Sequence, residues 1–346
     1  MSRSHLASTF EQQARACARL GSPMYEQLLD AMAADIDAAG PTRAVLVGHE
    51  DDPGPSALAL RLLGSLHRLV LDGSAPALAP YYPSLGGAWD LGSAWPAIQD
   101  VLAEQRATLN AVLDQAPQTN DVGRSAALLG GLLHVADRFG LPVRLHEIGA
   151  SAGLNLRADH FQYGYDGGRW GPPESPVVLS GAWRGPLPPI GAPLQVVERH
   201  GTDLAPIDVG TRSGRTAVMS YVWPDMRERL ERLRGALALA RAVPAVVERG
   251  DAVDAVRGLR TRPGSVTVLW HSVMWQYLDL ARRERVAALL DGLGAAATPD
   301  APFAHLYLEP QRRAPHGEHE FLVVLQTWPG GGPQVLGTAD PHGVPT

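Results

Sequence analysis

Residues 143–161 read VRLHEIGASAGLNLRADHF, and this stretch decides the fold. A β-rich run ends near Glu147, a turn of small residues spans Gly149 to Gly153, and a helix is predicted to follow. In open α/β sheets, ligands bind beyond the carboxyl ends of the strands, where glycine lets the backbone approach closely and a helix N-terminus offers free N–H groups. We therefore predict an α/β fold with a ligand site at this turn; a packing turn without a ligand is the alternative.

Downstream of the turn, short β-rich runs alternate with helical stretches. The predicted strands after VRLHEI are PLQVVE, TAVMSYVW, PAVVER, SVTVLWHSV, FAHLYLE and EFLVVLQTW, and the clearest helices are DMRERLERLRGALALARA and ARRERVAALLDGLG. Such alternation is typical of a parallel sheet covered on both faces, and the last two strands, with no helix between them, should form an antiparallel edge. Residues 164–192 are rich in Gly, Pro and Trp, and we expect an insertion there that covers the site.

The first part of the chain has the apolar spacing of amphipathic helices, as in MYEQLLDAMAADIDAA and AIQDVLAEQRATLNAVLDQA. Thr119, Asn120 and Asp121 offer capping oxygens before VGRSAALLGGLLHVADRF, a helix expected to stop at Gly140. We therefore predict a helical N-terminal cap over residues 1–140 and an α/β domain over residues 141–346.

Composition excludes several classes of protein. A formal net charge of −6 without a basic stripe argues against nucleic-acid binding, and no apolar run approaches the roughly 18 residues of a membrane span. All 30 basic residues are arginine, so a Schiff-base lysine and a phosphate-loop lysine are both excluded. Cys17 is the only cysteine, and the N-terminus lacks the pattern of a secretory signal. The expectation is a cytoplasmic enzyme for a small-molecule substrate, with no nucleic-acid or membrane partner and no predicted oligomeric state.

The segment EIGASAGLNL resembles the first motif of the class I S-adenosylmethionine-dependent methyltransferases, an acidic residue near the end of the first strand followed by a Gly-rich turn. The resemblance implies a Rossmann-like sandwich that binds S-adenosylmethionine through Glu147, Gly149, Ser151 and Gly153. Ser151 stands where the family usually has its middle glycine.

The resemblance continues downstream in the same order. LQVVERHGTDLAPID resembles the second strand, whose acid binds the ribose hydroxyls, with Asp203 as first choice and Glu198 as second. VVERGDAV resembles the third strand, which assigns Asp251 to the adenine edge. VTVLWHSVMWQYL holds the position of the fourth strand, whose tip faces the transferred methyl group, and this nominates His271 as general base together with Ser272.

Two further acids are candidates for the same edge of the sheet. Asp225 lies in YVWPD, which we expect to follow a strand, and it is interpreted as a base or as the N-cap of the next helix. Glu309 closes FAHLYLE just before Pro310 and should point at the same edge.

Over nearly its whole length the chain resembles the bacterial domain of unknown function 2332 family. The segments that carry the likeness are EIGASAGLNL, QTNDVGR at residues 118–124, YVWPD at residues 221–225 and WPGG at residues 328–331. This resemblance supports the architecture and names no reaction.

A competing hypothesis uses the same turn as a G-x-S-x-G nucleophile elbow, similar to that of hormone-sensitive-lipase-like esterases. Ser151 would be the nucleophile of a serine hydrolase, and the remaining triad candidates are Asp279, Asp300, His316, His319 and His342. Against it, no strands are predicted before residue 143 and no HGGG loop is present. The HGEHE segment at residues 316–320 is interpreted as a solvated loop rather than a metal site. A non-catalytic metabolite-binding protein is the third alternative.

Overall fold

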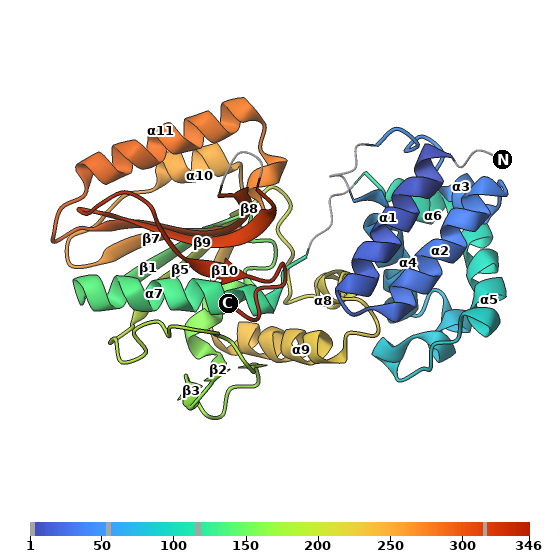
Figure 1. Ribbon diagram of the computed structural model, residues 1–346, viewed down its shortest axis with the longest axis horizontal. Coiled ribbons are helices and arrows are strands. Elements are labelled where there is room, and N and C mark those ends of the chain that lie inside the picture. Colours follow the sequence, from blue (N-terminus) through green and yellow to red (C-terminus); the bar gives the residue numbers. More distant parts are fainter. Residues whose placement is uncertain (1–3, 53–56, 115–118, 314–316) are drawn as a thin grey trace. The chain divides into compact units, whose positions relative to one another are not determined.

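The computed structural model describes residues 4–52, 57–114, 119–313 and 317–346, which form two compact units (Figure 1). The helical unit comprises residues 1–119 and 211–230, and the α/β unit comprises residues 120–210 and 231–346. This differs from the predicted boundary at residue 140 in two ways. Helix α7 (Ser125–Phe139) belongs to the α/β unit, and a segment from the second half of the chain belongs to the helical unit.

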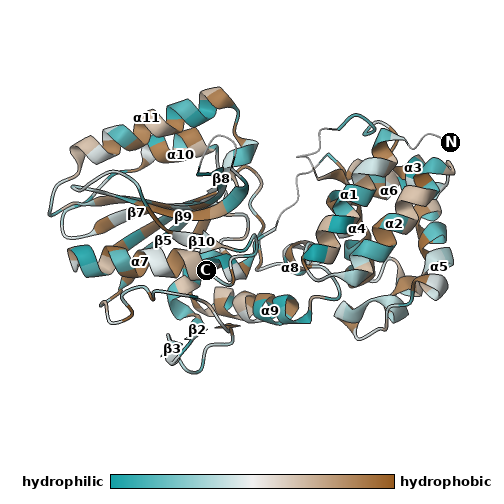
Figure 2. Cartoon of the chain, viewed as in Figure 1, coloured by the Kyte–Doolittle hydropathy of each residue, from teal (hydrophilic) through white to brown (hydrophobic). Residues whose placement is uncertain are grey.

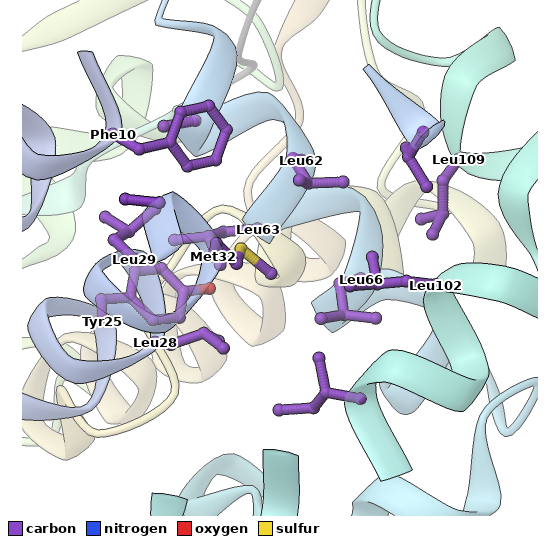
Figure 3. Packing of buried hydrophobic residues seen from close by; sticks show 14 of the residues in the cluster. Phe10, Tyr25, Leu28, Leu29, Met32, Leu62, Leu63, Leu66, Leu102 and Leu109 are labelled. Atoms are coloured by element: carbon purple, nitrogen blue, oxygen red, sulfur yellow. The ribbon is translucent and has the colours of Figure 1, made fainter. Parts of the chain in front are cut away.

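The helical unit is built from amphipathic helices around one apolar core. Phe10, Tyr25, Met32 and Leu62 are almost fully buried and point toward one another in Figure 3. The α-helices are α1 (His5–Arg19), α2 (Pro23–Asp37), α3 (Pro41–Val45), α4 (Leu58–Asp72), α5 (Leu91–Glu104), α6 (Arg106–Ala111) and α8 (Arg212–Ser220), joined by the 3₁₀ helices η2 (Pro76–Tyr81) and η3 (Pro83–Leu85). None of the helices in the described part of the chain combines the length and the apolar character needed to span a membrane.

The predicted strand TAVMSYVW is wrong, because these residues form most of α8 and the turn after it. Thr211 caps the helix by accepting a hydrogen bond from a backbone N–H of its first turn. The helix packs on α4, where Gly64 leaves room for the Tyr221 ring: a Cβ at Gly64 would lie 2.7 Å from it. His67 of α4 also lies 3.1 Å from the Ser220 carbonyl oxygen through Nδ1. A short apolar run fits either period, and tertiary packing selects the helix.

Asp225 therefore follows helix α8 rather than a strand, so the expected reason for placing it at the sheet edge does not hold. Its Oδ1 accepts a hydrogen bond from Ser22 Oγ (2.7 Å) and its Oδ2 accepts one from the Met24 N–H (3.0 Å). Ser22 is the N-cap of α2, so the Asp225 carboxylate helps to satisfy the free N–H groups at the start of that helix. Both groups that it contacts belong to the helical unit.

The α/β unit contains a mostly parallel seven-stranded sheet in the order β10-β9-β8-β7-β1-β5-β6. The strands are β1 (Val143–Ile148), β5 (Val196–Asp203), β6 (Val246–Arg249), β7 (Val266–Ser272), β8 (Phe303–Arg312), β9 (His319–Trp328) and β10 (Gln334–Ala339). Five neighbouring strands are parallel and lie in the order β6-β5-β1-β7-β8. From β1 the chain first adds β5 and β6 on one side and then β7 and β8 on the other, so the strand order reverses between β1 and β7. The predicted antiparallel edge is confirmed by β8 and β9; β10 was not predicted.

Helices cover both faces of this sheet, with α7 on one face and α10 (Ala252–Gly258) and α11 (Leu280–Ala296) on the other (Figure 1). Successive side chains of a strand point to opposite faces. Leu145 and Trp270 accordingly pack with α7, whereas Ile148 and Leu269 pack with α10 and α11. Figure 2 shows apolar residues running through the strands, while the helices carry both polar and apolar residues. Helix α9 (Arg227–Ala242) continues from the helical unit into the α/β unit.

The predicted insertion contains a small sheet of its own, made of β2 (Gln162–Tyr165), β3 (Gly168–Trp170) and β4 (Val178–Leu179). Tyr163 stacks on Trp183 with ring centroids 5.4 Å apart, and the Trp183 indole donates a hydrogen bond to the Ala126 carbonyl oxygen (3.0 Å). These contacts fix the insertion to the start of α7. The helix predicted after the glycine turn is a short 3₁₀ helix, η5 (Leu154–His160).

Candidate functional site

The turn after β1 has a left-handed backbone at alternate positions. The φ angles of Gly149, Ser151 and Gly153 are +70°, +52° and +65°. Glycine adopts this region without steric cost, whereas serine does so only rarely. Ser151 replaces a glycine of the usual Gly-rich turn but keeps the left-handed conformation that glycine favours. Residues held in such strained conformations cluster at functional sites.

Hydrogen bonds from two neighbouring segments hold the turn. Asp203 at the end of β5 accepts the Ser151 N–H through Oδ2 (2.8 Å). Two other N–H groups of the turn donate to the Thr202 carbonyl oxygen (2.9 and 3.2 Å). Asn120, just before α7, accepts the Leu154 N–H through Oδ1 (2.9 Å). Asn120 lies in the QTNDVGR segment, whose first residue is outside the described ranges, and its role in the turn was not predicted from the sequence.

At the turn and on the strands that lead to it, three buried polar atoms have no hydrogen-bond partner among the described residues: Glu147 Oε2, Ser151 Oγ and Trp270 Nε1. Glu147 and Trp270 are register partners on β1 and β7, so both side chains lie on the α7 face of the sheet. Glu147 is 3% exposed and Ser151 is 6% exposed. Buried polar groups are almost always paired, so three unpaired ones beside a strained turn indicate a place where a ligand could bind.

Burial raises the pKa of the Glu147 carboxyl from 4.5 to about 8. The Trp270 indole opposes this rise in pKa, although its Nε1 does not reach hydrogen-bond geometry. The charge of the Asp203 carboxylate raises the pKa further, and the charges of Arg157 and Arg124 lower it. The carboxyl is therefore mostly protonated at neutral pH.

Asp203 is the last residue of β5, and Asp251 is the N-cap of α10. Both lie at the same edge of the sheet as the turn. Their segments are tied together by the Gly250 N–H, which donates to the Asp203 carbonyl oxygen (2.9 Å). Asp251 caps α10 by accepting the Val253 N–H (2.8 Å), and its Oδ2 lies 3.5 Å from Arg282 Nε. Each carboxylate still has lone pairs for a ligand.

Glu198, the second choice for the ribose acid, lies near the other end of β5. Its carboxylate forms a bidentate pair with Arg144 (2.7 and 3.1 Å), its register partner on β1. Hydrogen bonding to Arg144 lowers the pKa of the Glu198 carboxyl. A position five residues before Asp203 cannot reach the carboxyl edge of a strand that rises about 3.3 Å per residue.

His271, the predicted general base, lies among buried polar groups. It is 2% exposed and lies on the α10 and α11 face, because it directly follows Trp270 on the strand. Nδ1 lies 2.8 Å from Glu309 Oε1, and Nε2 lies 3.0 Å from His305 Nε2. Both ring nitrogens of His271 therefore face buried side chains of β8. Ser272, the last residue of β7, is only partly buried and lies on the same face as Trp270.

The residues of the competing triad are not assembled around Ser151, whose Oγ meets no imidazole in the described ranges. Asp279 caps α11 by accepting the Arg282 N–H (2.8 Å), and His342 Nδ1 lies 2.9 Å from Asp121 Oδ2. His316 lies outside the described residues. Among those described, no three His, Cys, Asp or Glu side chains are arranged to hold a metal ion.

Comparison with known proteins identifies a family but no activity. No curated protein and no solved structure matches the chain. One family model, described as "Uncharacterized protein conserved in bacteria (DUF2332)", matches residues 7–346. This match spans both the helical unit and the α/β unit, and it confirms the family resemblance expected from the four sequence segments. The chain belongs to the bacterial DUF2332 family.

Proposed function

We propose that the α/β unit binds S-adenosylmethionine over the turn after β1 and transfers its methyl group to a small molecule. The observation that carries this proposal is the group of three buried atoms, on Glu147, Ser151 and Trp270, that meet no hydrogen-bond partner among the described residues at the left-handed turn. The turn lies beside the point where the strand order reverses, and ligands of doubly wound sheets bind at such points.

The residues present fit the chemistry of this cofactor. S-adenosylmethionine carries a sulfonium centre and an ammonium group, and the free Glu147 oxygen is suited to a cation. Asp203 and Asp251 would accept hydrogen bonds from the ribose hydroxyls and the adenine amino group. The bound cofactor would supply an electrophilic methyl group, and the chain would contribute by holding two reactants in line.

Acceptor chemistry at the tip of β7 would fall to Ser272 rather than to His271 or Glu309. Ser272 is partly exposed and follows Trp270 on the face that carries Glu147. Its hydroxyl would orient the acceptor by hydrogen bonding. His271 and Glu309 engage each other on the opposite face, and their contribution would be structural.

A cationic ligand should couple to the protonation of Glu147. Burial raises the pKa of this carboxyl to about 8, so most of it carries a proton at pH 7. A cation that binds the ionised carboxylate must therefore displace the proton of Glu147. Affinity should therefore rise with pH, by up to about tenfold per pH unit, until the pH exceeds the pKa of Glu147.

Isothermal titration with S-adenosylmethionine and S-adenosylhomocysteine tests the proposal. Wild-type protein should bind both ligands, and Glu147→Gln should weaken S-adenosylmethionine binding by about 10-fold or more and remove the pH dependence. The matched control is Glu284→Gln on the exposed side of α11, which should leave affinity unchanged. No heat with either ligand at any pH from about 6 to 9 would exclude the proposed cofactor.

One observation favours a second candidate, the serine hydrolase. The buried hydroxyl of Ser151 sits on a left-handed residue between a strand and a helix, as a nucleophile elbow requires. A screen of short acyl esters separates the two candidates, since ester cleavage that Ser151→Ala abolishes would reverse the ranking. A protein that binds a ligand but converts no acceptor would be a metabolite-binding protein.

A further inference from the structure

The loop that follows β7 begins with a strained residue. Val273 has a φ of +51°, a region in which a β-branched side chain is a genuine outlier. Its N–H donates to the Leu308 carbonyl oxygen (3.0 Å), which continues the pairing of β7 with β8 for one residue. Such a conformation persists only where the surroundings fix it.

The fixing group is the carboxylate of Glu309 on β8. Its Oε1 accepts the N–H groups of Met274 (3.0 Å) and Trp275 (3.3 Å), the two residues that follow the strained Val273. The same oxygen lies 2.8 Å from His271 Nδ1. One buried oxygen therefore gathers two loop N–H groups and one imidazole nitrogen.

The orientation of Glu309 is set in turn by the groups packed around His271. The His271 ring stacks with Trp275 (centroids 5.0 Å apart) and with Tyr307 (5.3 Å apart). His305 closes the row, with its Nε2 3.0 Å from His271 Nε2. If His271 donates its Nδ1–H to the Glu309 carboxylate, its Nε2 accepts the hydrogen bond from His305 Nε2–H.

This loop touches the glycine turn. A Cβ at Gly149 would lie 2.9 Å from Met274 Cβ and 3.0 Å from Met274 Cγ, so Met274 packs directly on the turn. We propose that Glu309 is a positioning residue, which holds residues 273–277 in their strained turn so that Met274 forms the β7-side wall of the ligand site. The inference rests on the proposed function for the identity of the ligand, but the Glu309 contacts are independent of it.

The test compares Glu309→Ala with Glu309→Gln, which keeps one acceptor oxygen for the two loop N–H groups. Amide exchange of Met274 and Trp275 should become about 10-fold faster or more in the alanine variant and remain near wild type in the glutamine variant. Titration with S-adenosylmethionine should follow the same order, with affinity about tenfold weaker in Glu309→Ala and largely retained in Glu309→Gln. The control is Glu284→Ala on the exposed side of α11.

Unchanged amide exchange in Glu309→Ala would overturn the inference, as would faster exchange with unchanged affinity. A wild-type protein that fails to bind S-adenosylmethionine would contradict the proposed function instead, and amide exchange alone would then decide whether Glu309 holds the loop. Should Glu309→Ala not fold, the double variant Val273→Gly/Glu309→Ala removes the strain that Glu309 offsets. We expect it to fold, with the Met274 and Trp275 amides exchanging about 10-fold faster than in Val273→Gly alone, because they still lack the Glu309 acceptor. Exchange as slow as in Val273→Gly would count against the assignment.

Discussion

Replacing Glu147 by glutamine should stabilise the protein progressively as the pH rises. The pKa of this carboxyl is about 8 in the folded chain against 4.5 without burial. Between these values the folded state binds more protons than the unfolded state, so the free energy of unfolding falls as the pH rises through this window. Glutamine does not ionise, so the free energy of unfolding of Glu147→Gln does not fall in this window for that reason.

The magnitude follows from the width of the window. Where the folded state binds one proton more than the unfolded state, the free energy of unfolding falls by about 1.4 kcal/mol for each pH unit. Integrating from about pH 5.5 to about pH 9, where the folded-state carboxyl has ionised, gives a change of about 3 kcal/mol in favour of the variant. The offset at a single pH also contains the different hydrogen bonding of an amide, so only the change with pH is diagnostic.

Urea unfolding of wild type, Glu147→Gln and the exposed control Glu284→Gln at several pH values measures this difference directly. The gap between Glu147→Gln and wild type should widen steadily with pH, while the control should run parallel to wild type. A gap that stays constant between about pH 5.5 and pH 9 would mean that Glu147 ionises at an ordinary pKa, and the argument from its burial would fail.

Three further substitutions probe other parts of the structure by urea unfolding. Gly149→Ala should lower the free energy of unfolding by about 2–4 kcal/mol, because the backbone is left-handed there and the new Cβ would clash with Met274 in the loop after β7. The control Gly140→Ala is also left-handed but has no neighbour within reach of a Cβ, so it should lower the free energy of unfolding by only about 1–2 kcal/mol. Equal losses in the two variants would argue against the clash. Glu198→Gln should cost about 1 kcal/mol or less at neutral pH because its ion pair is partly exposed, and the loss should fade as the pH falls through the lowered pKa of this carboxyl; a loss that grows in acid would contradict the pairing. Asp225→Ala should lower the free energy of unfolding of the helical unit by about 1–2 kcal/mol, because Ser22 Oγ and the Met24 N–H at the start of α2 lose their acceptor. Unchanged stability of that unit would contradict this role of Asp225.

Where the sequence pattern was strong, it predicted the structure well. VRLHEI forms β1 with the predicted bounds, and the antiparallel last pair follows from the missing helix between β8 and β9. The resemblance to the second and third methyltransferase strands placed Asp203 and Asp251 at strand ends; Asp203 ends β5 and Asp251 follows β6. These features depend on short-range patterns, which a single sequence carries.

The features that were missed depend on which elements meet in space. TAVMSYVW has no period that separates helix from strand, and its packing on α4 decides the outcome. Trp270 belongs to the candidate site only because β1 and β7 are adjacent and place it in register with Glu147. The same alternation places His271 on the face opposite Trp270, and the resemblance that nominated His271 carries no information about that facing.

The most direct test of the central claim is a crystal structure of the protein grown with S-adenosylhomocysteine. The account predicts ligand density over residues 149–153, with the amino-acid portion beside Glu147 and the ribose beside Asp203 at the end of β5. A turn that stays free of ligand at saturating concentration, or a ligand bound away from the β1 and β7 tips, would contradict it.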